Sequence, residues 1–158
     1  MKVVLVQPEI PQNTGNIGRL CVATNTPLYL VKPLGFFLSS KQIKRSGLDY
    51  WKDLDVKLAD SLEEIVDENP KSRLWYVSTK GQKEYWKVKF KKNDILVFGS
   101  ESKGLPKELL ETNKNQTLKI PMWGPVRSLN LATATGIVLY EAYRTVGATG
   151  IEPVASTV

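Results

Sequence analysis

Four short, largely apolar runs constrain the fold of this chain more than any other feature of its sequence. They cover residues 2–7, 28–31, 73–79 and 94–98. Apolar side chains at consecutive positions are typical of strands buried on both faces, as in a parallel sheet, whereas a half-exposed strand alternates apolar and polar residues. Segments with helical spacing separate the runs, so the sequence predicts an α/β fold with a parallel sheet flanked by helices.

The intervening segments predict helices at residues 14–24, 60–69 and 107–111, and a short basic helix or turn at residues 39–47. We expect Asn13 or Thr14 to cap the first helix. The spacing of its apolar residues turns Arg19 away from the core. Ligand crevices of open α/β sheets form just after the carboxyl ends of parallel strands, so Arg19 is either a ligand contact or a solvated arginine.

Residues 86–92 alternate apolar and lysine side chains, which predicts an exposed edge strand. Trp86, Val88 and Phe90 would share one face of this strand. A row of lysines discourages pairing between the edges of two sheets, and we prefer this explanation of the segment to RNA binding.

The segment 119–144 combines a short strand, a loop with proline and glycine, and a long helix. Ser128 stands where the N-cap of this helix is expected, and a helix N-terminus favours polar or anionic ligand groups. The helix is apolar almost all round, because only Asn130, Glu141 and Arg144 form a polar stripe. One small sheet covers one side of such a helix, so we expect a second copy to cover another and the protein to be a homodimer.

The length of 158 residues and the 42% hydrophobic content predict one globular domain spanning residues 1–158. No apolar run approaches the roughly 20 residues that cross a bilayer, so we expect a cytoplasmic protein with no membrane partner. Residues 147–158 show no periodicity, and we expect this tail to be loosely held.

The charge and the cysteine and histidine content bound the possible chemistry. A net charge of +6 and a pI of about 9.4 favour a polyanionic partner without proving one. The single cysteine, Cys21, excludes an internal disulfide, and the absence of histidine removes the commonest metal ligand and general base. Histidine-based triads and metal sites are therefore excluded, and we expect no metal cofactor.

Two glycine-containing loops, residues 98–106 and 120–130, each follow a strand and precede a helix. They should be neighbours at one edge of the sheet. Gly99 and Gly104 have the spacing of a phosphate-binding loop, but Leu105 and Pro106 replace the Lys-Ser/Thr pair that it needs, and no G-x-G-x-x-G motif occurs. We expect these glycines to allow positive φ and close approach to a ligand, and the loops to hold a flat heterocycle with polar edges.

Three segments, residues 8–19, 98–106 and 120–131, resemble in order and spacing the three motifs of the SpoU branch of the SPOUT RNA 2′-O-ribose methyltransferases. Residues 47–50, Gly-Leu-Asp-Tyr, and the length look most like the members of that branch that methylate the wobble nucleotide of tRNA. The resemblance covers essentially residues 1–145. It implies a parallel α/β sheet whose C-terminal part forms a deep trefoil knot, an exception to the rule against knots.

The resemblance also implies S-adenosylmethionine as cofactor, with tRNA and a second copy of the chain, but not DNA, as partners. The residues carried over as cofactor-binding are Val77, Thr79, Gly99, Glu101, Ile120, Met122, Ser128 and Leu129. Those carried over as catalytic are Arg19, Ser128 and Asn130. We add Lys41, Lys44 and Arg45 to Arg19 and Tyr140 as candidate RNA contacts, although a solvated face explains the three basic residues equally well.

The activity implied is methyl transfer to the ribose 2′-hydroxyl of cytidine or uridine at the first anticodon position, with leucine tRNAs as the expected substrates. A guanidinium stays protonated near neutral pH, so Arg19 is better suited to hold a phosphate or stabilise an alkoxide than to act as a base. Two alternatives stay open. One is a ribosomal RNA methyltransferase of the same fold, and the other is a module that binds RNA or a nucleotide without chemistry.

Overall fold

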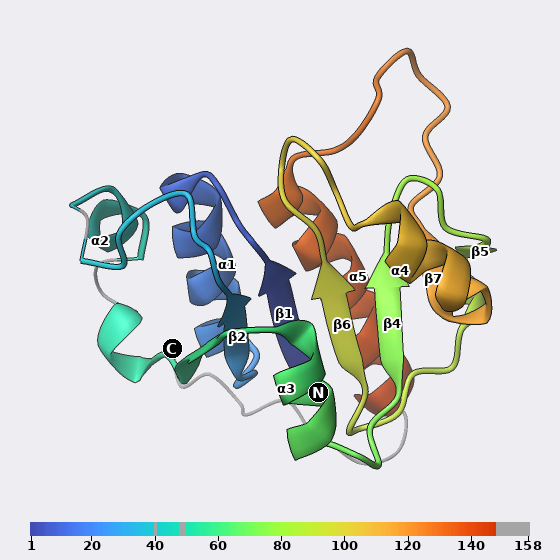
Figure 1. Ribbon diagram of the computed structural model, residues 1–158, viewed down its shortest axis with the longest axis horizontal. Helices are drawn as coiled ribbons and strands as arrows, with labels where there is room; N and C mark the ends of the chain where they lie inside the picture. Colours follow the sequence, from blue (N-terminus) through green and yellow to red (C-terminus); the bar gives the residue numbers. More distant parts are fainter. Residues whose placement is uncertain (40, 48–49, 148–158) are drawn as a thin grey trace, which may run out of the picture.

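All the strand pairings in the described part of the chain are parallel, as the apolar runs predicted. A computed structural model describes residues 1–39, 41–47 and 50–147, and its sheet has the strand order β3-β2-β1-β6-β4-β7-β5 (Figure 1). The strands are β1 (Lys2–Val6), β2 (Leu28–Val31), β3 (Val56–Ala59), β4 (Leu74–Val77), β5 (Lys83–Glu84), β6 (Ile95–Phe98) and β7 (Thr117–Lys119). The α-helices are α1 (Pro11–Ala23), α2 (Lys41–Gly47), α3 (Leu62–Glu68), α4 (Lys107–Thr112) and α5 (Leu131–Gly147).

Helices cover both faces of the sheet, which explains why the central strands are continuously apolar. On one face, Val3 and Leu5 of β1 belong to a core with residues of α1 and α5. On the other face, Val4 packs with residues of α3, and α4 adds partly buried leucines. Consecutive residues of one strand are therefore buried on opposite faces of the sheet. Each fully buried aliphatic side chain contributes roughly 1.5–3 kcal/mol to the stability of the fold.

One buried carboxylate joins residues at the amino-terminal ends of two neighbouring strands. Asp94, only 1% exposed, accepts hydrogen bonds from Arg73 Nε at 2.9 Å and Nη2 at 2.6 Å, from Trp75 Nε1 at 3.0 Å and from the Lys91 amide at 2.8 Å. These donors tie the start of β4 to the start of β6. Because this edge satisfies its own polar groups, a ligand site is expected at the opposite, carboxyl-terminal edge.

The predicted edge strand at residues 86–92 is wrong. Residues 85–87 form a 3-10 turn, and the edge strand next to β7 is the shorter β5. Val88 and Phe90 are buried, with the Phe90 ring packed edge-on against Trp75 at 6.1 Å, whereas Trp86 is 44% exposed. Packing onto the face of the sheet buries alternate residues as well as strand pairing does, so the alternation alone did not distinguish the two.

The opposite edge strand, β3, was not predicted. It pairs with β2, but its Lys57 and Leu58 are exposed, and this mixed pattern gives no strand signal.

The short basic helix is confirmed as α2. The predicted tail, residues 147–158, lies outside the described residues from position 148 onward. Within the described ranges, no helix is long and apolar enough to cross a membrane. The trefoil knot stays a prediction.

Candidate functional site

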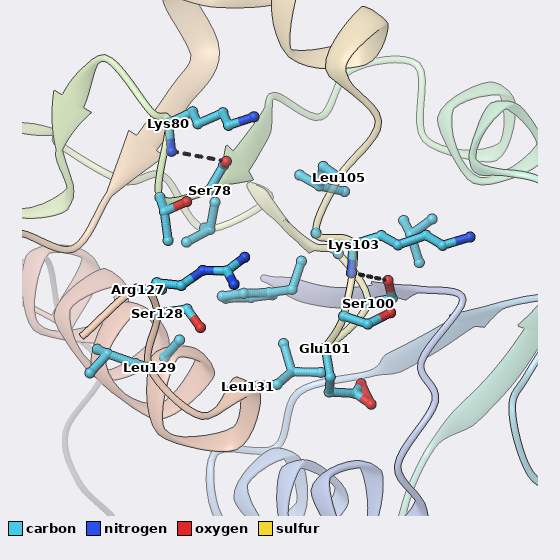
Figure 2. A pocket seen from close by; sticks show the side chains of 18 of the residues that line it. Ser78, Lys80, Ser100, Glu101, Lys103, Leu105, Arg127, Ser128, Leu129 and Leu131 are labelled. Atoms are coloured by element: carbon cyan, nitrogen blue, oxygen red, sulfur yellow. Dashed lines mark hydrogen bonds between the residues drawn. The ribbon is translucent and has the colours of Figure 1, made fainter.

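A cavity of about 1190 Å³ opens at the carboxyl-terminal edge of the sheet, where β4, β6 and β7 end and α5 begins. Four separate segments of the described chain line it. One runs from Val6, at the end of β1, to Asn13 of α1. Figure 2 shows side chains of the other three around one space: Ser78 and Lys80 after β4, Ser100, Glu101, Lys103 and Leu105 after β6, and Arg127, Ser128, Leu129 and Leu131 at the start of α5. The predicted proximity of the two glycine-containing loops is confirmed, because both border this cavity.

The residues carried over as cofactor-binding all border the same cavity. They are Val77, Thr79, Gly99, Glu101, Ile120, Met122, Ser128 and Leu129. Asn130 borders it as well. The structure therefore brings together residues that are far apart in the sequence, and their role in holding a cofactor stays a prediction.

The loop after β6 is closed by its own backbone. Ser100 and Gly104 form an antiparallel bridge, with the Gly104 amide donating to the Ser100 carbonyl at 2.9 Å. Gly104 has the expected positive φ, of 66°. The expected positive φ at Gly99 is wrong, because Gly104 is the one glycine of the described residues with a positive φ. A Cβ at Gly99 would lie 2.1 Å from the Gly104 carbonyl carbon, so the close approach of its own loop requires glycine here. A close approach of a ligand to Gly99 stays a prediction.

The same loop completes the start of α1. The Glu101 carboxylate accepts hydrogen bonds from the amides of Glu9, at 2.9 Å, and Ile10, at 2.6 Å. The predicted cap at Asn13 or Thr14 is wrong, because α1 begins at Pro11 and its N-cap, Ile10, has no side-chain capping bond. A carboxylate far away in the sequence thus supplies the acceptors and the negative charge that a helix N-terminus favours.

The two carboxylates at this corner have opposite pKa shifts. Burial raises the pKa of Glu101, and the amide donors of Glu9 and Ile10 offset only part of that effect. The hydroxyl of Ser102 donates to Glu9 Oε1 at 2.6 Å and lowers the pKa of Glu9. Although Glu101 borders the cavity, its carboxylate is hydrogen-bonded to backbone amides at the start of α1. Glu101 therefore holds the loop in position and does not present an unpaired charge to a ligand.

Asn130, not Ser128, caps α5. Its side-chain oxygen accepts hydrogen bonds from the Ala132 amide at 2.9 Å and the Thr133 amide at 3.3 Å. Its side-chain amide donates to Asn13 Oδ1 at 3.0 Å, which links α5 to α1. The predicted cap at Ser128 is wrong because α5 begins later, at Leu131, and this leaves Ser128 exposed at the cavity.

Arg19 points away from the core, as predicted, but it is not among the described residues that border the cavity. Its guanidinium lies over the ring of Tyr50, 4.8 Å from the centroid. On α2, which packs against α1, Lys41 and Arg45 are exposed, and the side chain of Lys44 lies outside the described part of the structure. Tyr140 of α5 is 55% exposed. The candidate RNA contacts therefore lie on the helices and not inside the cavity.

Charge and reactivity further limit the chemistry of the site. Among the described residues that border the cavity, Lys80, Lys103, Lys107 and Arg127 are cationic and Glu101 alone is a carboxylate. No role was predicted for these four, although their position beside the loops was a usable signal.

Burial raises the pKa of Cys21 to about 12, so its thiol is not a nucleophile. No cluster of metal-ligating side chains occurs in residues 1–39, 41–47 and 50–147.

Comparisons with known proteins agree on one family and one fold. The model of the SpoU rRNA Methylase family matches residues 1–140. A putative tRNA (cytidine(34)-2′-O)-methyltransferase of Bacillus subtilis is 46% identical over 147 residues, which is 91% of this chain and 92% of the relative. A structure described as giving insight into 2-OH methylation of C/U34 on tRNA has a TM-score of 0.88 and 49% identity, and the match covers 95% of this chain and 97% of that one.

A more distant structure carries the cofactor. An AdoMet-bound rRNA methyltransferase from Sinorhizobium meliloti has a TM-score of 0.80 and 28% identity, and the match covers 90% of this chain and 55% of that one. The predicted parallel α/β sheet flanked by helices is thereby confirmed as the fold shared with these enzymes.

Proposed function

The chain belongs to the SpoU rRNA methylase family, and on that basis we propose that it transfers a methyl group from S-adenosylmethionine to the ribose 2′-hydroxyl of the wobble nucleotide of a tRNA. The nucleotide is cytidine or uridine at position 34, and leucine tRNAs are the first to test. The observation that carries this proposal is the 49% identity to a protein whose structure concerns 2-OH methylation of C/U34 on tRNA. We propose that the enzyme acts in the cytoplasm.

The cavity fits the cofactor of this family. Its volume exceeds the range of about 300–1,000 Å³ in which most ligand pockets fall, so a nucleoside has room beside the reacting ribose. Leu105, Ile120, Met122 and Leu129 provide apolar walls for a flat ring. At Gly104 the space where a Cβ would project is clear of protein atoms. When bound, S-adenosylmethionine supplies a methyl group that its sulfonium makes electrophilic.

The chain's own residues orient the substrate and stabilise charge. Ser128 is exposed at the cavity close to the N-terminus of α5, where its hydroxyl and the positive end of the helix dipole suit a polar or negatively charged group. Asn130 positions this corner by capping α5 and bonding to Asn13. Arg19 holds a phosphate of the RNA or stabilises the developing alkoxide, and the proton leaves to water or to phosphate.

We propose a homodimer because Arg19 and the cavity lie apart within one chain. The Arg19 guanidinium stacks on Tyr50, and α5 leaves Tyr140 exposed on its outer side. An arrangement in which α5 meets a second copy would cover Tyr140 and bring residues of one chain to the cavity of the other. Sedimentation at micromolar concentration tests this, and a monomer that is fully active would contradict it.

The direct test is incubation of the purified protein with labelled S-adenosylmethionine and, side by side, total tRNA and ribosomal RNA, followed by digestion and mapping of the label. We expect label on the ribose of nucleotide 34 of tRNA. Label on ribosomal RNA alone would instead support the ribosomal alternative, for which the cofactor-bound relative at 28% identity speaks. Cofactor binding without any labelled RNA would support a non-catalytic module.

The role of Arg19 is tested by Arg19→Ala, with Lys71→Ala as the control, because Lys71 is an exposed cation before β4, at the end of the sheet opposite the cavity. We expect Arg19→Ala to leave cofactor affinity within about a few-fold and to lower turnover by about 100-fold or more, because it removes stabilisation made only in the transition state. Calorimetry and single-turnover kinetics measure the two effects. Loss of cofactor binding in Arg19→Ala would assign this arginine to the cofactor instead of the RNA.

A further inference from the structure

An almost fully exposed indole stands beside the cavity. Trp123 is 86% exposed, in contrast to Trp75, which is buried in the core. It belongs to the loop of residues 120–130, which stands out from the body of the protein beyond the ends of the strands (Figure 1). Met122, on one side of Trp123, and Arg127 border the cavity. A large apolar ring held in water at the entrance to a site indicates a contact made during function.

The charge around Trp123 identifies the kind of partner. The sequence has no Asp or Glu between Glu111 and Glu141, whereas Lys114, Lys119 and Arg127 lie within that stretch. Among the described residues, four cations and one carboxylate border the cavity, and that carboxylate, Glu101, is hydrogen-bonded to backbone amides at the start of α1. A symmetric contact between two copies through this surface would bring like charges together. A polyanion with exposed flat rings fits both the charge and the indole.

We propose that Trp123 is a stacking platform for an unpaired base of the RNA substrate, next to the nucleotide that enters the cavity. This rests on the proposed function and adds a base-binding site outside the cavity. The Arg127 side chain points into the cavity (Figure 2), so it meets the phosphate or ribose of the entering nucleotide while Trp123 holds a neighbour. Unpaired loop nucleotides present free base faces, and stacking on an aromatic ring accepts any base.

The size of the effect follows from base stacking on aromatic side chains. Replacing such a ring with alanine costs about 1–3 kcal/mol per base, so Trp123→Ala weakens binding of a stem-loop RNA by about 5- to 150-fold. Trp123→Phe keeps a ring and recovers most of the affinity. Trp86→Ala removes a second partly exposed indole that is not among the described residues bordering the cavity, and it is the matched control.

The experiment measures the dissociation constants of a fluorescently labelled anticodon stem-loop for the wild type, Trp123→Ala, Trp123→Phe and Trp86→Ala. Cofactor affinity by calorimetry and mass by sedimentation are measured on the same samples. We expect only Trp123→Ala to lose RNA affinity. In addition, abasic nucleotides introduced one position at a time should abolish the difference between wild type and Trp123→Ala at one position flanking the target.

Other outcomes would overturn the proposal. Equal losses in Trp123→Ala and Trp123→Phe would rule out stacking, and an unchanged affinity in Trp123→Ala would leave Trp123 without a role in RNA binding. A change in cofactor affinity or in mass would assign Trp123 to the cofactor pocket or to a contact between copies. These readouts are independent of methyl transfer. An enzyme that binds the stem-loop through Trp123 but labels no RNA would therefore contradict the proposed function and not the stacking site.

Discussion

The loops at residues 99–106 and 120–130 border the same cavity but are built in opposite ways. The 99–106 loop is bridged between Ser100 and Gly104 and is fastened to α1 through Glu101. In the 120–130 loop, residues 123–128 are all exposed, and the firm attachment is at its end, where Asn130 caps α5. The comparison indicates a division of work: the first loop sets the geometry of the cavity, and the second is available to close on ligands.

The largest difference between the loops is expected at their glycines. In Gly99→Ala the added Cβ would collide with the backbone of Gly104 and Leu105, so we expect a loss of stability of about 3 kcal/mol or more, or no folded protein. In Gly124→Ala the Cβ meets no atom within 4 Å, and stability should change by less than about 0.5 kcal/mol. Urea unfolding of both variants measures this. Similar losses in the two would remove the distinction between the loops.

A smaller effect is expected at the link between the 99–106 loop and α1. Glu101→Ala removes the acceptor for the amides of Glu9 and Ile10, and we expect a loss of about 1–2 kcal/mol. Glu101→Gln retains one side-chain oxygen and should lose less. A stable Glu101→Ala variant with unchanged affinity for S-adenosylmethionine would show that the loop keeps its shape without this link.

The pH dependence of the same carboxylate provides a second check. Burial raises the folded-state pKa of Glu101 above 4.5, so its contribution to stability is present below the unfolded pKa and is lost as pH rises through the folded pKa. Glu101→Gln should therefore remove a decline in stability that the wild type shows just above pH 4.5. If the stabilities of the wild type and of Glu101→Gln changed with pH in the same way across that window, the raised pKa of Glu101 would be contradicted.

The smallest effect is expected at the attachment of the 120–130 loop. Asn130→Ala removes the cap of α5 and the bond to Asn13, and should cost about 1 kcal/mol. Asn130→Asp keeps the capping oxygen but loses the donor to Asn13, which separates the two contributions. Thermal unfolding of the three proteins measures both. An effect as large as that of Gly99→Ala would mean that the second loop is as structural as the first.

The buried central strands and the proximity of the two loops could be predicted from the sequence, because continuous apolar runs are a local signal and the shared carboxyl-terminal edge of a parallel sheet is a topological rule. The edge strands β3 and β5 could not be predicted. The caps could not. Glu101 completes α1 from a segment far along the chain, so Asn13 and Thr14 were the only local candidates. Ser128 and Asn130 are both good caps by residue type, and the start of α5 at Leu131 makes Asn130 the cap. The strand predicted at residues 86–92 is absent. Val88 and Phe90 are buried against the face of the sheet, and this burial gives the same alternation of apolar and polar residues as an edge strand.

Hydrogen–deuterium exchange of the backbone amides, followed in the free protein, with S-adenosylmethionine, and with S-adenosylmethionine and a tRNA stem-loop, tests the division of work most directly. We expect residues 99–106 to exchange slowly in all three states. Residues 120–130 should exchange rapidly in the free protein, slowly with the cofactor, and more slowly still at residues 123–128 once RNA is added. Equally slow exchange of both loops in the free protein, or RNA protection confined to residues 99–106, would contradict the account.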